Sequence, residues 1–176
     1  MKNSLHSGFS LIEVLVTMVL VAVTLLGLMG IQARSLTYQV DSINGRAASD
    51  LISQFRERLT ANHESYMTNI ATTFRVTINP GELAPTIPAC DPCTTPDDVA
   101  QKELGLWLSE VQRRMPDPAV RMAPLTVGDV EGMNITLGWL DSEAVQDGIG
   151  NGCPADFALI ATNPRYRCIT MTIFPG

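Results

Sequence analysis

A single carboxylate near the start of a long apolar segment is the most unusual chemical feature of this sequence. Glu13 lies within Gly8 to Leu15, and no Asp, Glu, Lys or Arg occurs from Val14 to Ala33. As a helix, the segment would span about 30 Å at ~1.5 Å per residue, the thickness of a bilayer's hydrocarbon core. A carboxylate costs about 2 to 3 kcal/mol at the bilayer centre. Its presence beside this segment therefore predicts a partner for Glu13.

Four cysteines form the second chemical feature. Cys90, Cys93, Cys153 and Cys168 all lie beyond the apolar segment. An even number of cysteines in an exported domain, which meets an oxidising environment, predicts two disulfides. Of the three possible connectivities we prefer Cys90 with Cys93 and Cys153 with Cys168. The near pair can hardly be joined elsewhere without leaving two distant cysteines unpaired.

The Cys-x-x-Cys spacing of Cys90 and Cys93 also allows a redox or zinc site. Thioredoxin-like chemistry usually places this motif at the start of a helix in a βαβ fold, and zinc knuckles usually contain two close pairs. The spacing from Cys153 to Cys168 does not repeat the close pair. Disulfides are therefore favoured, and we expect no metal.

No set of residues in the sequence indicates catalysis. His63 is the single histidine beyond residue 8, where we expect it on a solvated face or in a loop, and no glycine-rich phosphate loop or Ser/His/Asp motif is present. Scattered acids of the kind common in turns and on surfaces are Asp129, Glu131, Asp141 and Glu143. We therefore predict no enzyme, no catalytic residue and no cofactor.

Length and charge narrow the function further. The 176 residues carry 12 Lys and Arg against 18 Asp and Glu, a formal net charge of −6. This length suits one long helix with one globular domain. DNA phosphates are bound mainly through Lys and Arg, so an acidic domain is a poor candidate for direct nucleic-acid binding.

Apolar residues continue at helical spacing beyond the apolar segment. The stripe comprises Leu36, Val40, Ile43, Ala47, Leu51, Phe55 and Leu59. No proline precedes Pro80, so one helix is predicted from Phe9 to about Ala61. We expect residues 9–33 to be the transmembrane part and residues 34–61 to be an amphipathic continuation that buries the stripe against a sheet.

The remaining residues, 62–176, have a strand-rich pattern with one additional helix. That helix is predicted to begin after Thr95, a capping residue followed by Pro96 and two aspartates, and to end before Pro116. Strands are predicted at residues 74–78, 120–127, 133–140, 157–162 and 168–174. The sequence therefore predicts an α+β fold, with a mostly antiparallel sheet of about four strands on the second half of the long helix.

Three interpretations of the N-terminus compete. A secretory signal would explain Lys2 and the apolar run, but the run exceeds the usual length and ends in Ile31-Gln32-Ala33, a poor cleavage site. A simple membrane anchor explains the length but neither Glu13 nor the polar residues 1–8. The third interpretation rests on Ser7 to Glu13, Ser-Gly-Phe-Ser-Leu-Ile-Glu, which resembles the class III leader of type IV prepilins.

This resemblance implies a role for each residue of the motif. A prepilin peptidase would remove residues 1–8 by cutting between Gly8 and Phe9, and would then methylate the new amine of Phe9. In a low-dielectric bundle of helices, Glu13 of one subunit would attract that amine on a neighbour and set the axial register of assembly. The alternative for Glu13 is a snorkelling side chain with no partner.

Two further features resemble the PilV family, the type IV pilus modification proteins. One is the glycine-spaced run Leu26 to Ala33, and the other is the pair Cys90 and Cys93 ahead of a helix that contains Trp107. The resemblance implies a type IV pilin-like fold and a minor pilin that helps prime pilus assembly. Its partners would be other minor pilins, the major pilin and a tip adhesin, with roles in adhesion and twitching motility.

The same resemblance implies a location. Before assembly the chain would be a single-pass inner-membrane protein with a periplasmic domain, and after assembly it would lie at or near the pilus tip on the cell surface. Two alternatives stay open. One is a pseudopilin of a type II secretion system, which has the same kind of N-terminus, and the other is a membrane-anchored periplasmic binding domain.

Overall fold

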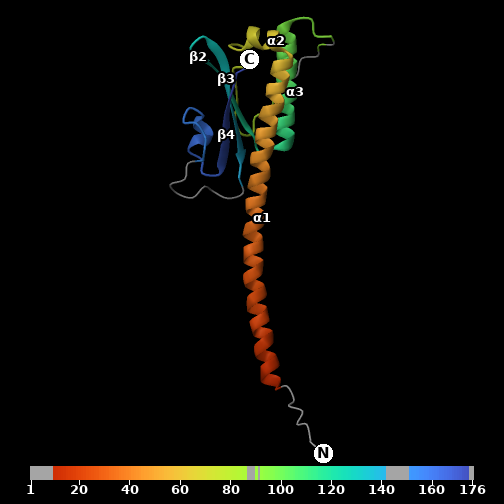
Figure 1. Cartoon of the computed structure of the whole chain (residues 1–176), viewed down its shortest axis with the longest axis vertical. Coiled ribbons are helices and arrows are strands. Elements are labelled where there is room, and N and C mark those ends of the chain that lie inside the picture. The colour runs from red at the N-terminus through yellow and green to blue at the C-terminus, as the bar shows by residue number, and fades with distance from the viewer. Residues whose placement is uncertain (1–9, 87–89, 91, 142–150, 175–176) are drawn as a thin grey trace, which may run out of the picture. The chain divides into compact units, whose positions relative to one another are not determined.

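The computed structural model describes residues 10–86, 90, 92–141 and 151–174, and the chain divides into two units, Met1–Val40 and Asp41–Gly176. Helix α1 (Leu11–Ala61) has 51 residues and contributes to both units (Figure 1). Its end at Ala61 is the end that the sequence predicts. The predicted first residue, Phe9, lies outside the described residues.

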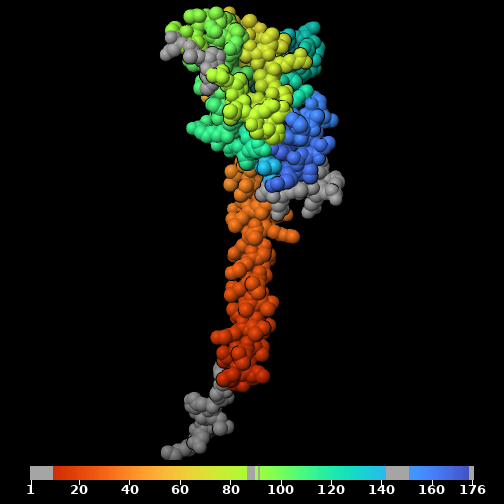
Figure 2. All heavy atoms as spheres, turned by 180° about the vertical axis from the view of Figure 1, so that it is seen from behind, coloured from red at the N-terminus to blue at the C-terminus, as the bar shows by residue number. Residues whose placement is uncertain are grey.

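The first unit consists of the N-terminal part of α1. Among the described residues, α1 is the one helix long and apolar enough to cross a membrane. Large apolar side chains are exposed along this part of α1, which is drawn in red and orange in Figure 2. The hydroxyls of Thr17 and Thr24 donate to the carbonyls of Val14 and Val21, each at 2.8 Å. These two polar groups therefore need no partner from outside the helix.

The second unit contains a four-stranded antiparallel sheet. Its strands are β1 (Val76–Ile78), β2 (Ala119–Val127), β3 (Val130–Leu140) and β4 (Tyr166–Ile173), in the spatial order β1-β2-β3-β4. The tight turn between β2 and β3 contains Gly128 at φ +62°, a conformation that favours glycine. The predicted α+β, type IV pilin-like arrangement of a long helix on an antiparallel sheet is confirmed.

Helix α3 (Pro96–Arg114) is the additional helix that the sequence predicts. Thr95 caps it by accepting a hydrogen bond from the backbone N–H of Asp98 at 3.2 Å, and Pro96 fills the first turn. The structure adds two shorter helices that were not predicted, α2 (His63–Asn69) and α4 (Ala158–Ala161). His63, expected on a solvated face or in a loop, is exposed as the first residue of α2.

The main core lies between the second half of α1, helix α3 and the sheet. The Trp107 ring of α3 lies 4.5 Å from the Phe55 ring of α1, centroid to centroid, and its indole N–H donates to the Leu51 carbonyl at 2.8 Å. All three residues are at most 1% exposed. Met122 and Ile135 belong to the same buried cluster on the sheet side. The core therefore fixes α3 against α1 by both packing and a buried hydrogen bond.

The predicted strand at residues 157–162 is wrong. Ala158–Ala161 form α4 with Phe157 and Thr162 at its two ends, and the backbone N–H groups of Ile160 and Ala161 both donate to the Phe157 carbonyl. A short apolar run has no period that separates a strand from a helical turn, so its surroundings decide. Here the run packs as a second small core with Ala119 and Tyr166. Strand β4 accordingly begins at Tyr166, two residues before the predicted start.

The predicted burial of the whole apolar stripe of α1 is also wrong. Leu36, Val40 and Ile43 are 62%, 49% and 63% exposed, and full burial begins at Ala48. The physical reason is helical pitch, because each four-residue step turns about 40° beyond a full turn. Two such steps separate Ile43 from Leu51, so within the domain unit Ile43 is turned about 80° around α1 from the fully buried Leu51.

Candidate functional site

Glu13 lies in the first turn of α1 and is exposed. Its backbone N–H donates to the Ser10 carbonyl at 3.0 Å, so the helix is already hydrogen-bonded around the carboxylate. A negative side chain is favourable at this end of a helix because the N-terminal N–H groups carry partial positive charge. Gly8 and Phe9 lie outside the described residues, so cleavage after Gly8 and methylation of Phe9 stay predictions.

Large apolar side chains are exposed along α1, beginning beside Glu13 and continuing toward Ile31. Leu11, Ile12, Leu26 and Ile31 are 69% to 78% exposed. Such a continuous apolar surface is not stable in water and must be covered by lipid or by other helices. An added Cβ at Gly27 or Gly30 would meet no atom of the chain within 4 Å. Contacts within this chain therefore do not require glycine at either position.

Ion pairs hold α1 and α3 together at the margin of the core. Arg58 of α1 pairs with Glu103 of α3 at 2.7 Å, and Asp50 of α1 pairs with Arg114 at 3.0 Å. These side chains are 27% to 52% exposed, so each pair contributes only about 0.2 to 1 kcal/mol. Sequence reasoning missed both pairs, because partners on two different helices leave no short spacing to detect.

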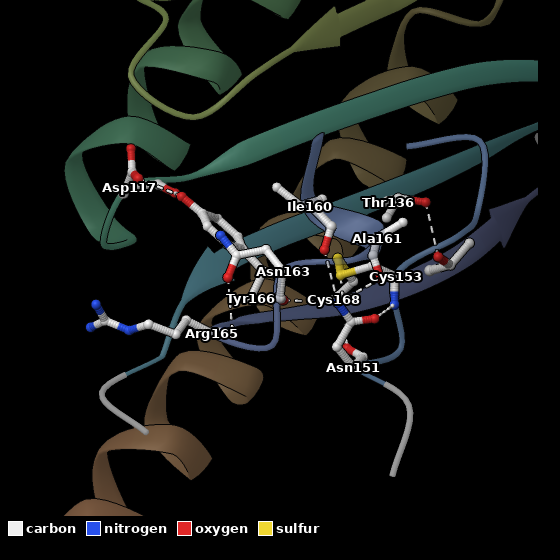
Figure 3. Close-up of a disulfide and its surroundings, with 11 residues drawn as sticks. Asp117, Thr136, Asn151, Cys153, Ile160, Ala161, Asn163, Arg165, Tyr166 and Cys168 are labelled. Carbon is white, nitrogen blue, oxygen red and sulfur yellow. Dashed lines mark hydrogen bonds between the residues drawn. A yellow bond between two sulfur atoms is a disulfide. The ribbon is translucent and has the colours of Figure 1, made fainter. Parts of the chain in front are cut away.

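Cys153 and Cys168 form a disulfide with a Cα–Cα distance of 4.8 Å. Figure 3 shows that it ties the segment before α4 to strand β4. The disulfide borders the small core of Phe157, Ile160 and Tyr166. It therefore joins the second, smaller core covalently to the sheet.

Asn151 organises the segment around this disulfide and was missed by sequence reasoning. Its side-chain amide donates to the carbonyls of Ile160 at 2.8 Å and Asn163 at 3.2 Å (Figure 3). Its own backbone carbonyl accepts from the N–H of Cys168 at 3.0 Å. One asparagine thus satisfies carbonyls at the end of α4 and also pairs with β4.

Cys90 and Cys93 form the other disulfide, also with a Cα–Cα distance of 4.8 Å. The Lys102 ammonium group of α3 donates to the Cys90 carbonyl at 2.9 Å. The two disulfides of the structure are the pairs that we preferred from the spacing. In the part of the chain that the structure describes, no three His, Cys, Asp or Glu side chains gather in a way that could hold a metal ion.

Two aspartates of the domain unit lie close together, Asp41 on α1 and Asp141 directly after β3. The Asp141 carboxylate pairs with Arg167 at 2.9 Å, and its side chain is only 5% exposed. Burial, then the nearby Asp141 carboxylate, raises the pKa of Asp41 on α1, while Arg167 opposes the rise. The expected surface position is therefore wrong for Asp141, because its pair with Arg167 allows the carboxylate to be buried. Asp129 and Glu131 are exposed, and Glu143 lies outside the described residues.

Asp117 holds the corner between α3 and β2. It has a left-handed backbone with φ 42°, and its carboxylate accepts hydrogen bonds from the N–H of Gly81 at 2.9 Å and from the hydroxyl of Tyr166. Burial and this carboxylate both raise the pKa of Tyr166. The corner is therefore a structural junction between a turn, a helix end and β4.

Comparison with known protein families identifies the N-terminal part of the chain. Residues 3–29 match the family described as the prokaryotic N-terminal methylation motif. Neither a curated protein nor a solved structure matches the chain. The match covers most of the leader and the exposed, apolar start of α1, which contains Glu13.

The motif and the fold together define a class. The chain carries a class III prepilin leader and is a prepilin-like protein of the kind found in type IV pilus and type II secretion systems. Such leaders are processed by prepilin peptidase, and the apolar helix indicates inner-membrane anchoring before assembly. Pilin-like proteins are generally not enzymes.

Proposed function

We propose that this chain is a PilV-like minor pilin that helps prime type IV pilus assembly. It would be incorporated at or near the filament tip with other minor pilins and a tip adhesin. The observation that carries the proposal is a methylation motif at residues 3–29 joined to a helix whose apolar surface is left exposed by the rest of the chain. The glycine-spaced run Leu26 to Ala33 supports a minor pilin in particular.

The proposed assembly contact is electrostatic. Cleavage after Gly8 creates a cationic amine on Phe9, and Glu13 of the neighbouring subunit pairs with it among packed helices. Both charges leave water when the helices pack, so each stabilises the assembly only when the other is present. The exposed position of Glu13 in the first turn of α1 supports such a contact between subunits.

Removal of this charge tests the contact. Glu13→Ala is expected to lower recovery of the chain in pilus-subunit complexes at least tenfold, because the neighbour's amine would be buried without a partner. The measurement is quantitative immunoblotting of the complexes against total membrane protein. Glu57→Ala is the matched control, since Glu57 is an exposed glutamate on the same helix. Recovery of Glu13→Ala at the level of the wild-type protein would contradict the pairing.

Two measurements test the proposed function as a whole. Mass spectrometry of the mature N-terminus is expected to show N-methylated Phe9, and an unprocessed Met1 would indicate a plain anchored domain instead. Co-purification is expected to recover pilus minor subunits and the tip adhesin. Recovery with secretion pseudopilins in their place would overturn the pilus assignment while keeping the prepilin-like class.

A further inference from the structure

The backbone pattern of β3 shows which groups of the sheet point outward. The N–H of Leu140 donates to the Pro116 carbonyl on the β2 side, and the N–H of Asp141 donates to the Arg165 carbonyl on the β4 side. Backbone groups alternate sides in antiparallel strands, so even-numbered residues of β3 face β2 and odd-numbered residues face β4.

One open edge of the sheet is protected. Strand β1 covers β2 only from Val120 to Met122. Because Ala123 is opposite Asn134, an even-numbered residue of β3, the next outward position on β2 is Pro124. Proline has no N–H to offer a further strand, and natural proteins use it to block strand addition at sheet edges.

The edge at β4 has no such protection. Ile169 and Met171 are opposite Leu137 and Ile135, odd-numbered residues of β3, so the backbone groups of Cys168, Thr170 and Thr172 point away from the sheet. The N–H of Cys168 already donates a hydrogen bond to the Asn151 carbonyl. Within the described ranges, the backbone groups of Thr170 and Thr172 have no hydrogen-bond partner in the structure, and both residues are exposed.

The side chains along this edge are uncharged. No Asp, Glu, Lys or Arg occurs from Cys168 to Phe174. The Thr170 hydroxyl is hydrogen-bonded to Thr136 at 2.9 Å, and the Thr172 hydroxyl to Asn134 at 2.6 Å. Met171, opposite the fully buried Ile135, is itself 37% exposed. The edge therefore offers main-chain hydrogen bonds and apolar surface rather than charge.

We propose that the β4 edge, from Thr170 to Phe174, is a docking site for an extended, uncharged segment of another subunit, which adds to the sheet as a fifth strand. Main-chain groups of Thr170 and Thr172 bind the segment, and its side chains cover Met171. Asn151 fixes the register by blocking the position at Cys168. The proposal rests on the proposed function, because the strand comes from a second pilus subunit.

The test uses a proline that blocks the edge without disturbing the sheet. The N–H of Thr172 points outward, so Thr172→Pro removes a docking group that the sheet itself does not use. Thr172→Ala is the matched control, because both variants lose the hydroxyl bond to Asn134. Thr170→Lys is a second variant, which adds a charge at the edge and keeps the backbone N–H.

The readout is photo-crosslinking of the full chain in cells, with p-benzoylphenylalanine in place of Met171. We expect a crosslink to another pilus subunit in the otherwise wild-type chain and in Thr172→Ala, and at least tenfold less in Thr172→Pro and Thr170→Lys. Equal crosslinking in Thr172→Pro, an equal loss in Thr172→Ala, or a crosslinked dimer of this chain would overturn the proposal. Thermal unfolding of each variant in detergent shows whether the domain is folded. If Thr172→Pro is not folded, the crosslinking of Thr170→Lys decides between the two outcomes.

Failure of this proposal is distinct from failure of the proposed function. The unmodified chain is purified with its partners in parallel. If it is recovered with pilus minor subunits while Thr172→Pro crosslinks as strongly as the unsubstituted edge, the strand site alone is overturned. If it is recovered with secretion pseudopilins and crosslinking to one of them still depends on the edge, the pilus assignment is overturned and strand addition at β4 is supported.

Discussion

The two ends of helix α1 have similar apolar side chains in opposite surroundings. Leu20 is 60% exposed, whereas Leu51 on the same helix is fully buried against α3 and the sheet. The helix geometry is the same in both places, so the difference comes from what covers each end. The buried end stabilises this chain's own domain. The exposed end has the same kind of surface uncovered by this chain, and under the proposed function that surface is covered by lipid or by neighbouring subunits.

One leucine substitution made at both ends tests this division most directly. Leu51→Ala is expected to lower the free energy of unfolding of the domain by about 2 to 5 kcal/mol, because it leaves a cavity in the core. Leu20→Ala is expected to change it by less than about 0.5 kcal/mol. Chemical denaturation of the full chain in detergent, followed by near-ultraviolet circular dichroism of the tryptophans, measures both. Similar losses at the two positions would contradict the division.

Glycine positions give a second, smaller contrast. Gly152 has φ +75°, and an added Cβ would lie 2.7 Å from the Cys168 carbonyl oxygen. Gly152→Ala is therefore expected to cost about 1 to 3 kcal/mol. Gly27→Ala meets open space and is expected to leave domain stability unchanged. Thermal unfolding of the two variants checks this, and a lower melting temperature for Gly27→Ala than for Gly152→Ala would be the contrary result.

Asp41, the first residue of the domain unit, gives the smallest expected effect. Because its pKa is raised above the ordinary 3.8, folding favours its protonated form, and its contribution to stability falls as pH rises above about 3.8. Asp41→Asn should therefore raise the melting temperature at pH 7 and leave it nearly unchanged at pH 3. The control is Asp50→Asn, which breaks the pair with Arg114 and should slightly lower stability at pH 7. No gain from Asp41→Asn at pH 7 would show that the Arg167 attraction dominates.

Local patterns predicted much of the fold. Thr95 and Pro96 marked the start of α3 because capping depends on residues within one turn. The uncharged run from Val14 to Ala33 similarly predicted the exposed start of α1. Sequence reasoning failed at residues 157–162, where a short apolar run fits a strand and a helical turn equally well. Only the small core around Ala119 and Tyr166 selected the turn.

Some residues of the candidate site could likewise be predicted from the sequence, and others could not. The leader motif and Glu13 are contiguous in sequence, so they could be found without a structure, whereas Asn151, the pair of Arg58 with Glu103 and the open edge of β4 could not. Each of those three depends on which distant segments meet.

The sequence by itself determined the long helix, its apolar beginning and the prepilin-like leader, because these follow from local composition and spacing. The tertiary structure decided where the stripe on α1 stops facing solvent and starts facing the sheet. It also decided which edge of the sheet is left open. Both depend on packing between segments far apart in the chain, and a periodicity of about 3.6 residues cannot encode the direction in which a partner lies.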